Sequence, residues 1–166
     1  VLEKVNNPKT EEEILELKNL WFRYERELPD ILEGISLKVH KGELVSIVGG
    51  NGSGKSTLLK VIASLEKPYK GTIKIKGKKL KEFMKNSLFK GVLALLPQNP
   101  QSVFIRDTVR EDYQEIFRVM GYSLEEGEEE LQRVASLLKI EELIDRHPYD
   151  LSGGEQQKVA LAKILA

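Results

Sequence analysis

The stretch Gly49-Gly50-Asn51-Gly52-Ser53-Gly54-Lys55-Ser56 decides the fold of this chain, because it matches the pattern G-x-x-x-x-G-K-[ST] of a phosphate-binding loop. Glycine lacks a Cβ atom, so the backbone N–H groups of such a loop can converge on phosphate oxygens. Lys55 adds a cation for the β and γ phosphates, and the Ser56 hydroxyl is a suitable oxygen ligand for Mg²⁺. We predict that Mg-ATP binds here, to Gly49, Gly50, Asn51, Gly52, Ser53, Gly54, Lys55, Ser56 and Thr57.

The segments on either side of the loop have the pattern that this interpretation needs. Leu44–Val48 is a short, mostly apolar run that ends in glycines, as does a strand buried on both faces of a parallel sheet. Ser56–Leu65 carries apolar residues at helical spacing and ends near Pro68, which predicts a helix after the loop. The start of that helix would add N–H donors and the positive end of its dipole. This context disfavours the alternative, a glycine turn beside a surface lysine.

The remaining segments divide into predicted strands and predicted helices. Strands are predicted at 14–20, 35–39 and 71–77, the last half-exposed and antiparallel, and a second buried strand at 92–96. Residues 109–144 have a mostly helical pattern, with breaks predicted around Gly121 and Gly127. A further helix is predicted to begin at Leu151-Ser152-Gly153-Gly154-Glu155 and to run to residue 166.

Composition narrows the possible functions. The 166 residues carry a formal net charge of zero, so no overall field favours nucleic acid or an anionic membrane as a partner. Charge is nevertheless segregated, with nine Lys and two Glu in residues 66–90 and nine acids and two Arg in residues 107–130. These are either solvated faces or docking surfaces. The absence of cysteine excludes disulfides, thiolate metal sites and cysteine nucleophiles.

Length, hydropathy and the first residue give three further expectations. The chain is long enough for one domain, or for a core domain with a small subdomain. Its apolar runs fall far short of the roughly 20 residues that a membrane span requires, so we expect a soluble protein. It begins at Val1 rather than Met, which we interpret as a processed end or a cut from a longer polypeptide.

A second candidate site lies at Leu151-Ser152-Gly153-Gly154-Glu155. Ser152 is a good N-cap, and the two glycines would let a phosphate approach the start of the following helix closely. The alternative is a capped helix with a flexible entry. From these residues alone, both interpretations stay open.

Three motifs in order resemble the ATP-binding cassette (ABC) family over residues 14–166. The glycine loop with Asn51 and Ser53 is similar to the Walker A motif of the family. Gln98, which follows an apolar strand, is similar to the glutamine of the family's Q-loop. Ser152-Gly153-Gly154, whose serine lies 97 residues beyond Lys55, is similar to its signature motif. Within the family, residues 97–100 and 107–112 look most like the ATPases of cobalt-type and energy-coupling-factor importers.

The resemblance implies roles for particular residues. Tyr24 stands where the family stacks an aromatic ring on adenine, the alternative being a core aromatic of a strand. Gln98 stands where the family contacts Mg²⁺ and the attacking water, the alternative being a loop amide. The motif Ser152, Gly153, Gly154, Glu155 would contact the γ-phosphate of ATP on a second subunit, in a head-to-tail dimer with two ATP molecules. Many members have Gln where this chain has Glu155.

Parts of the family pattern are not found in these residues. The family continues after the signature helix with a strand that ends in Asp-Glu and, later, with a switch histidine, so we expect negligible hydrolysis by this chain alone. His147 precedes the signature motif and is predicted to be a loop residue. His40, just before the Lys41-Gly42 turn, is likewise predicted to have no catalytic role. The absent strand would pack beside 44–48, so we expect either a fragment or a fold that pairs this edge with itself.

The resemblance implies an α/β fold: a P-loop NTPase core of mostly parallel sheet with flanking helices, an antiparallel β subdomain and a helical insertion, incomplete at the C-terminus. We expect a polar arm or linker at 1–13, and the antiparallel subdomain with the P-loop core at 14–98. The helical subdomain is expected at 99–150, and the signature motif with its helix at 151–166.

The function that the resemblance implies is the ATPase subunit of a membrane importer on the cytoplasmic face of the membrane. Its partners would be a second ABC ATPase domain and transmembrane transporter subunits, with no nucleic acid. One alternative is a non-transport ABC ATPase that acts on nucleic acid or ribosomes through residues 67–90. Another is a non-catalytic fragment that retains nucleotide binding.

Overall fold

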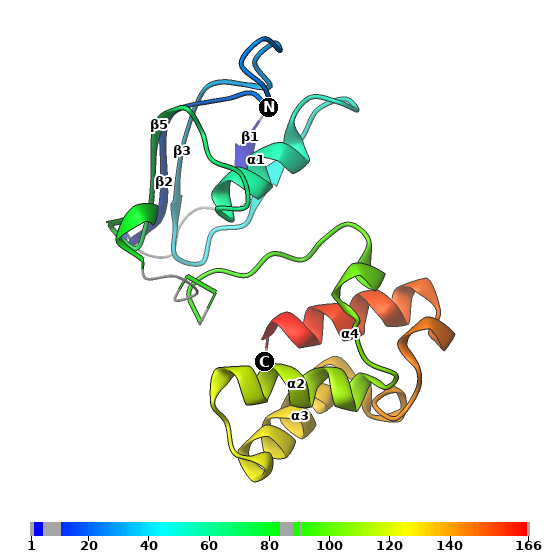
Figure 1. Ribbon diagram of the computed structural model, residues 1–166. Coiled ribbons are helices and arrows are strands. Elements are labelled where there is room, and N and C mark those ends of the chain that lie inside the picture. The colour runs from blue at the N-terminus through cyan, green and yellow to red at the C-terminus, as the bar shows by residue number, and fades with distance from the viewer. Residues whose placement is uncertain (1, 5–10, 84–87, 90, 166) are drawn as a thin grey trace. The chain divides into compact units, whose positions relative to one another are not determined.

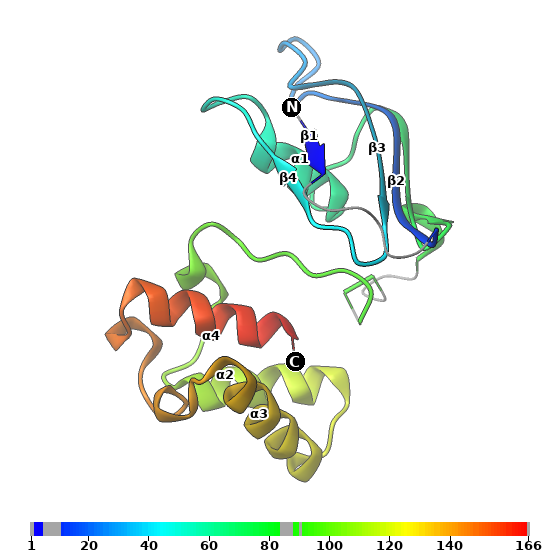
Figure 2. The same ribbon diagram turned by 180° about the vertical axis from the view of Figure 1, so that it is seen from behind.

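The computed structural model describes residues 2–4, 11–83, 88, 89 and 91–165, and the chain divides into two units, residues 1–93 and 94–166 (Figure 1). Within the described residues, the first unit holds the β-strands and helix α1, and the second unit holds helices α2, α3 and α4 (Figure 2).

An antiparallel sheet forms the larger part of the first unit. Its strands are β2 (Glu13–Phe22), β3 (Leu32–His40), β5 (Lys70–Ile75) and β6 (Lys78–Lys79), in the order β3-β2-β5-β6. Lys76 and Gly77, both with positive φ, form the turn between β5 and β6, and a short 3₁₀-helix, Leu80–Glu82, follows. The strands predicted at 14–20 and 35–39 are confirmed, and the strand predicted at 71–77 is confirmed as half-exposed and antiparallel but ends at Ile75.

A bulge in β2 decides which of its side chains face the core. Asn19 has φ +50°, a left-handed conformation that Asn tolerates better than most residues, and the pairing register shifts between Leu17 and Leu20. The shift lets both leucines, three positions apart, be buried on one face. On the neighbouring strand, a Cβ at Gly71 would lie 2.4 Å from the Asn19 carbonyl oxygen, so the bulge requires glycine there.

The structure differs from the prediction at 44–48 and 92–96, the two segments that we expected to be buried strands of a parallel sheet. β4 is only Val45–Ile47, is partly exposed, and pairs antiparallel with β1 (Leu2–Lys4), so part of the segment 1–13 interpreted as a polar arm is a strand. The strand predicted at 92–96 is wrong, because no described residue there is in a strand. A parallel strand needs hydrogen-bonded neighbours, and the described pairings that involve β4 are antiparallel.

Helix α1 (Lys55–Ile62) confirms the helix predicted after the glycine loop. Its apolar face joins the core of the first unit, where Leu58, Val61 and Ile62 are buried together with residues of β2, β3 and β5. The glycine loop is thereby fixed between a strand and a helix that packs on the antiparallel sheet.

The second unit is helical. Its helices are α2 (Val109–Met120), α3 (Leu124–Leu138) and α4 (Gly153–Leu165), with short 3₁₀-helices at Pro100–Val103, Glu141–Leu143 and Pro148–Asp150. The predicted break at Gly121 is confirmed, since Gly121 ends α2 with φ +91°. The predicted break at Gly127 is wrong. Gly127 lies within α3, where a Cβ would come 3.2 Å from the Phe117 side chain, so glycine there allows α2 and α3 to approach closely.

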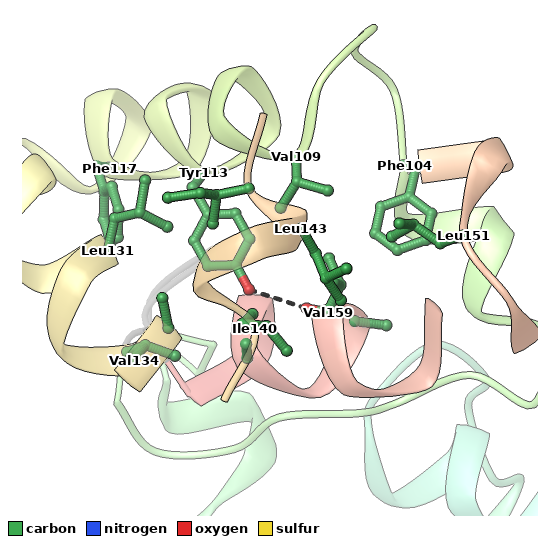
Figure 3. Packing of buried hydrophobic residues seen from close by; sticks show 14 residues of the cluster. Phe104, Val109, Tyr113, Phe117, Leu131, Val134, Ile140, Leu143, Leu151 and Val159 are labelled. Atoms are coloured by element: carbon green, nitrogen blue, oxygen red, sulfur yellow. Dashed lines mark hydrogen bonds between the residues drawn. The ribbon is translucent and has the colours of Figure 1, made fainter. Parts of the chain in front are cut away.

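The core of the second unit consists of apolar side chains from all three helices (Figure 3), and the polar residues Asp112 and Gln156 are buried as well. The hydroxyl of Tyr113 donates a hydrogen bond of 2.9 Å to the Val159 carbonyl, as Figure 3 shows. Lys163 of α4 forms a 2.9 Å ion pair with Asp112 of α2, which is fully buried, and also donates to the Val103 carbonyl. The Asp112 carboxylate in turn accepts from the Ile105 N–H at 3.0 Å. These bonds connect α4 to α2 and to the segment that precedes α2.

Among the described helices, none has both the length and the apolar character to cross a bilayer.

Candidate nucleotide-binding site

The backbone of the glycine loop is held in conformations that need glycine at Gly54. Gly54 has φ +87°, and a Cβ there would lie 3.0 Å from both the Ile31 side chain and the Ile31 carbonyl oxygen. Gly52 also has positive φ, +78°, and a Cβ there would meet nothing within 4 Å. The loop therefore follows a path that L-residues rarely adopt, with open space beside part of its backbone.

The start of α1 leaves its first N–H groups without a side-chain cap. Gly54 is the N-cap, it makes no side-chain hydrogen bond, and the first turn contains no acidic residue. The Gly54 carbonyl accepts from the Leu58 N–H at 2.8 Å, so the helix begins directly after the loop. An uncapped helix start beside glycines is a good anion-binding environment, because N–H dipoles and the helix dipole both favour negative charge.

Lys55 points its ammonium group back over the loop. Its Nζ donates to the Gly49 carbonyl at 2.9 Å and to the Gly50 carbonyl at 2.7 Å. The next hydroxyl, that of Ser56, is on an exposed residue of the first turn of α1. The cation and this oxygen ligand thus sit side by side at one helix start, which fits a phosphate group with a hard cation such as Mg²⁺.

Tyr24 lies next to this helix start. Its hydroxyl is 3.3 Å from the Thr57 Oγ1, although the two residues are 33 positions apart. The residue is 49% exposed, and its ring packs edge-on against Phe22 at a centroid distance of 5.0 Å. The alternative, a core aromatic, does not fit this exposure. The structure therefore brings Tyr24, Lys55, Ser56 and Thr57 together in one unit.

Three residues near Tyr24 were not predicted from the sequence. The Arg23 guanidinium lies 3.5 Å from the Asp30 carboxylate and 4.6 Å from the centre of the Tyr69 ring, and the Tyr69 hydroxyl donates to Asp30 at 2.9 Å. Burial and the bond to Asp30 raise the pKa of Tyr69. This cluster braces the loop after β2. No sequence pattern signals it, because Tyr69 lies far along the chain from the loop that holds Arg23 and Asp30, and the three residues have no common spacing.

Ile31 was also missed. With residues 52–57 it lines a cavity of about 170 Å³ at the glycine loop. Its only sequence signal is an apolar residue after Pro29-Asp30, and many loops contain such a residue.

The other predicted residues, Gln98 and the signature motif, belong to the second unit. Gln98 is exposed and precedes the 3₁₀-helix Pro100–Val103, which Asn99 caps by accepting from the Gln101 N–H at 3.1 Å. His147 accepts from the Tyr149 N–H at 3.2 Å and so caps a short 3₁₀-helix, which agrees with the prediction of a loop residue.

The signature motif forms the start of α4. Ser152 and Glu155 exchange hydrogen bonds, and the Gln156 N–H donates to the Ser152 carbonyl at 2.9 Å. Gln156 is buried and holds the entry loop by donating to the Pro148 carbonyl at 3.1 Å. Gly153 and Gly154 are exposed, and a Cβ on either would meet nothing within 4 Å. Neither glycine is therefore needed for packing of this unit, which leaves room for an approaching group.

A glycine loop with its lysine, set before an amphipathic helix, defines the class of P-loop nucleotide-binding proteins. Comparison with known sequences identifies the family within this class. The profile of the family described as "ABC transporter" matches residues 32–166. The chain belongs to the ABC transporter family.

The chain is similar to named members of this family. It is 39% identical over 158 residues to the energy-coupling factor transporter ATP-binding protein EcfA of Methanocaldococcus jannaschii, covering 92% of this chain and 55% of that protein. It is 40% identical over 163 residues to a putative ABC transporter ATP-binding protein of Clostridium tetani, covering 96% of this chain and 35% of that protein. The chain spans between about a third and three fifths of the length of such relatives.

Solved structures show the same fold. The chain matches cbiO1 of Clostridium perfringens, part of the ABC transporter complex cbiONQ, with a TM-score of 0.79 and 26% identity, covering 93% of this chain and 62% of that one. It matches a dimeric ATP-binding cassette in a post-hydrolysis state bound to ADP and Pi with a TM-score of 0.77 and 31% identity, covering 92% and 69%. The predicted P-loop NTPase fold and the resemblance to cobalt-type and energy-coupling-factor ATPases are confirmed.

Proposed function

We propose that this chain binds Mg-ATP between Tyr24 and the glycine loop, as the nucleotide-binding part of an importer ATPase. The observation that carries the proposal is the juxtaposition of an exposed ring, a cation and an uncapped helix start, all in the first unit. The ring offers a face for adenine, and the loop offers N–H groups for the phosphates.

Each residue has a chemical role in this proposal. Lys55 would transfer its two hydrogen bonds from loop carbonyls to the β and γ phosphates. Ser56 would supply an oxygen ligand for Mg²⁺, and the ion would neutralise phosphate charge. The contact with Mg²⁺ that the family resemblance implies for Gln98, a residue of the second unit, stays a prediction. Tyr24 would stack on adenine while its hydroxyl remains near Thr57.

The signature motif would act on ATP bound to a second ABC ATPase domain. We propose a head-to-tail dimer in which Ser152, Gly153 and Gly154 contact the γ-phosphate of the partner's ATP. The open space beside both glycines and the start of α4 support this role. The similarity to a dimeric cassette supports it as well.

The membrane partner is proposed to be a set of transmembrane importer subunits, which would hold this protein at the cytoplasmic face. The similarity to cbiO1, part of the complex cbiONQ, supports an importer. The second unit also has a cavity of about 860 Å³ between α2, the segment 105–107 that precedes it and the start of α3, lined by both charged and apolar side chains. This cavity suits a short amphipathic segment of a partner. The relatives reported above are transporter proteins, so they give no support to the nucleic-acid or ribosome alternative.

The test uses the full-length protein that contains this chain. We expect Mg-ATP to bind to the monomer and, at higher protein concentration, to cause dimerisation, measured by calorimetry and analytical ultracentrifugation. Lys55→Ala should abolish both. Ser152→Arg should leave ATP binding intact and prevent dimerisation, because a bulky cation would fill the space beside Gly153. Dimerisation of Ser152→Arg at the wild-type ATP concentration would disprove the proposed geometry.

A further inference from the structure

Three helix starts in the second unit have a hydroxyl residue followed three positions later by Glu. Thr108 with Glu111 caps α2, Ser123 with Glu126 caps α3, and Ser152 with Glu155 lies at the start of α4. In each, the Glu carboxylate accepts the backbone N–H of the hydroxyl residue, and the hydroxyl oxygen accepts the N–H of the Glu. This reciprocal arrangement is a capping box.

The capping box at Ser152 has one additional bond. The Ser152 hydroxyl donates to the Glu155 Oε2 at 2.6 Å, and the same oxygen accepts the Ser152 N–H at 2.8 Å. A serine hydroxyl has a single proton, so one donated bond uses its whole donor capacity. A hydroxyl whose proton is bonded to Glu155 must turn away from that carboxylate before it can donate to another oxyanion.

Glu155 also places negative charge at this helix start. The Ser152 hydroxyl, followed by the Ser152 backbone N–H, holds the pKa of Glu155 below its ordinary value, so the carboxyl is ionised at neutral pH. An ionised carboxylate at a helix start uses the same N–H dipoles that would attract a phosphate. The like charges of the carboxylate and a triphosphate also repel each other.

We propose that Glu155 restrains the signature motif, by competing with the γ-phosphate of the partner's ATP for the Ser152 hydroxyl and by repelling that phosphate. This inference rests on the proposed function of Ser152–Gly154. Glu155 is a positioning residue, because it acts through Ser152. Association driven by ATP then requires the Ser152 hydroxyl to leave Glu155 and donate to the γ-phosphate instead. The glutamate thereby sets the ATP concentration at which association occurs.

The test is the Glu155→Gln variant of the full-length protein. Glutamine keeps an acceptor for the Ser152 N–H, so the cap of α4 is retained while the charge is lost. With the nonhydrolysable analogue AMP-PNP and Mg²⁺, we expect half-maximal dimerisation at a roughly three- to tenfold lower nucleotide concentration than in the wild type. Nucleotide binding to the dilute monomer should be unchanged. A variant that is only structurally damaged would associate less well, so the direction of the change tests the idea.

Glu126→Gln is the matched control. It removes the same charge from the capping box of α3 without touching Ser152, and we expect it to leave the dimerisation curve unchanged. Equal or weaker association of Glu155→Gln relative to wild type would overturn the inference, as would an equal gain in Glu126→Gln. If the wild type neither binds AMP-PNP nor dimerises with it, the proposed function fails instead.

A double variant separates the two effects of Glu155. In a Ser152→Ala background no hydroxyl remains to compete for, so Glu155→Gln should give a smaller gain there than in the wild type. An undiminished gain would mean that charge alone restrains the motif, and would reject the hydrogen-bond competition.

Discussion

Helices α1 and α4 both begin at glycines, but the groups around their first turns differ. At α1 the N-cap is a left-handed glycine, with no side-chain cap and no acidic residue in the first turn. At α4 the serine before the glycines is bonded to a glutamate of the first turn. Since unpaired N–H groups and the helix dipole attract anions, the start of α1 is ready for a phosphate, whereas the start of α4 already faces a carboxylate. Two helix starts that both contain glycine can therefore differ in anion affinity because of one carboxylate side chain.

The largest expected effect is on the free energy of unfolding, and it comes from the ion pair that joins α4 to α2 in the second unit. Lys163→Met leaves the buried Asp112 carboxylate without its ion-pair partner, and we expect the free energy of unfolding to fall by about 3–5 kcal/mol. Urea denaturation measures this change. In the double variant Lys163→Met/Asp112→Leu most of the loss should be recovered, because no buried charge remains unpaired. Equal instability of the double variant would show that the unpaired charge is not responsible, and that packing or the lost bonds to the Ile105 N–H and the Val103 carbonyl are.

The next effect concerns the open start of α1. Gly54→Ala places a Cβ against Ile31 at a residue with φ +87°, which should lower stability by about 1–3 kcal/mol. Because the loop must shift to relieve the contact, ATP affinity in calorimetry should fall as well. Gly50→Ala is the control for stability, since its Cβ would meet nothing within 4 Å. Identical unfolding curves for the two variants would contradict this account of the loop.

A smaller effect is expected for the ring beside α1. Tyr24→Ala should weaken ATP binding about tenfold, or ~1.4 kcal/mol, because an exposed ring face is lost. Tyr24→Phe keeps the ring and removes only the long contact with Thr57, so its affinity should stay close to that of the wild type. If both variants lose the same affinity, the hydroxyl rather than the ring binds or orients the nucleotide.

The smallest effect concerns the carboxylate caps of the second unit. Bonds from Ser123, the backbone N–H first, hold the pKa of Glu126 below its ordinary value of 4.5. A carboxyl whose folded pKa is lowered stabilises the fold above its unfolded pKa, and this stabilisation is lost as the pH falls through the folded pKa. Urea midpoints of wild type and Glu126→Gln should therefore differ slightly at pH 7 and converge toward pH 3. A constant difference would mean that the charge of Glu126 does not matter.

The sequence predicted the glycine loop, α1 and the antiparallel strands correctly, because each is specified by local patterns. The loop depends on glycines at fixed spacing, and β5 on the alternation of Ile73 and Ile75 with lysines. A short apolar run such as 92–96 carries no such information, since strand formation there depends on neighbours far away in the sequence.

The sequence predicted the residues of the candidate site only where they are close together in the chain, at a spacing that a known motif specifies. Lys55 and Ser56 are adjacent to the glycines, so their place was readable from the chain. The approach of Tyr24 to Thr57 depends on how α1 packs on β2, and the Arg23, Asp30 and Tyr69 cluster joins separate segments. The predicted helix break at Gly127 was wrong for a related reason. A glycine in a helical pattern can indicate either a break or close packing of two helices, and only the position of Phe117 in the structure distinguishes the two.

The two bonds from Lys55 to the carbonyls of Gly49 and Gly50 make nucleotide binding at this loop an exchange reaction. The ammonium group breaks two contacts when it forms new ones, so the measured affinity is a difference between two sets of hydrogen bonds. The two carbonyl oxygens also keep the lysine ordered and close to the loop after one nucleotide leaves and before the next one binds. A substitution that weakened only these carbonyl contacts would raise affinity while making the loop less well defined.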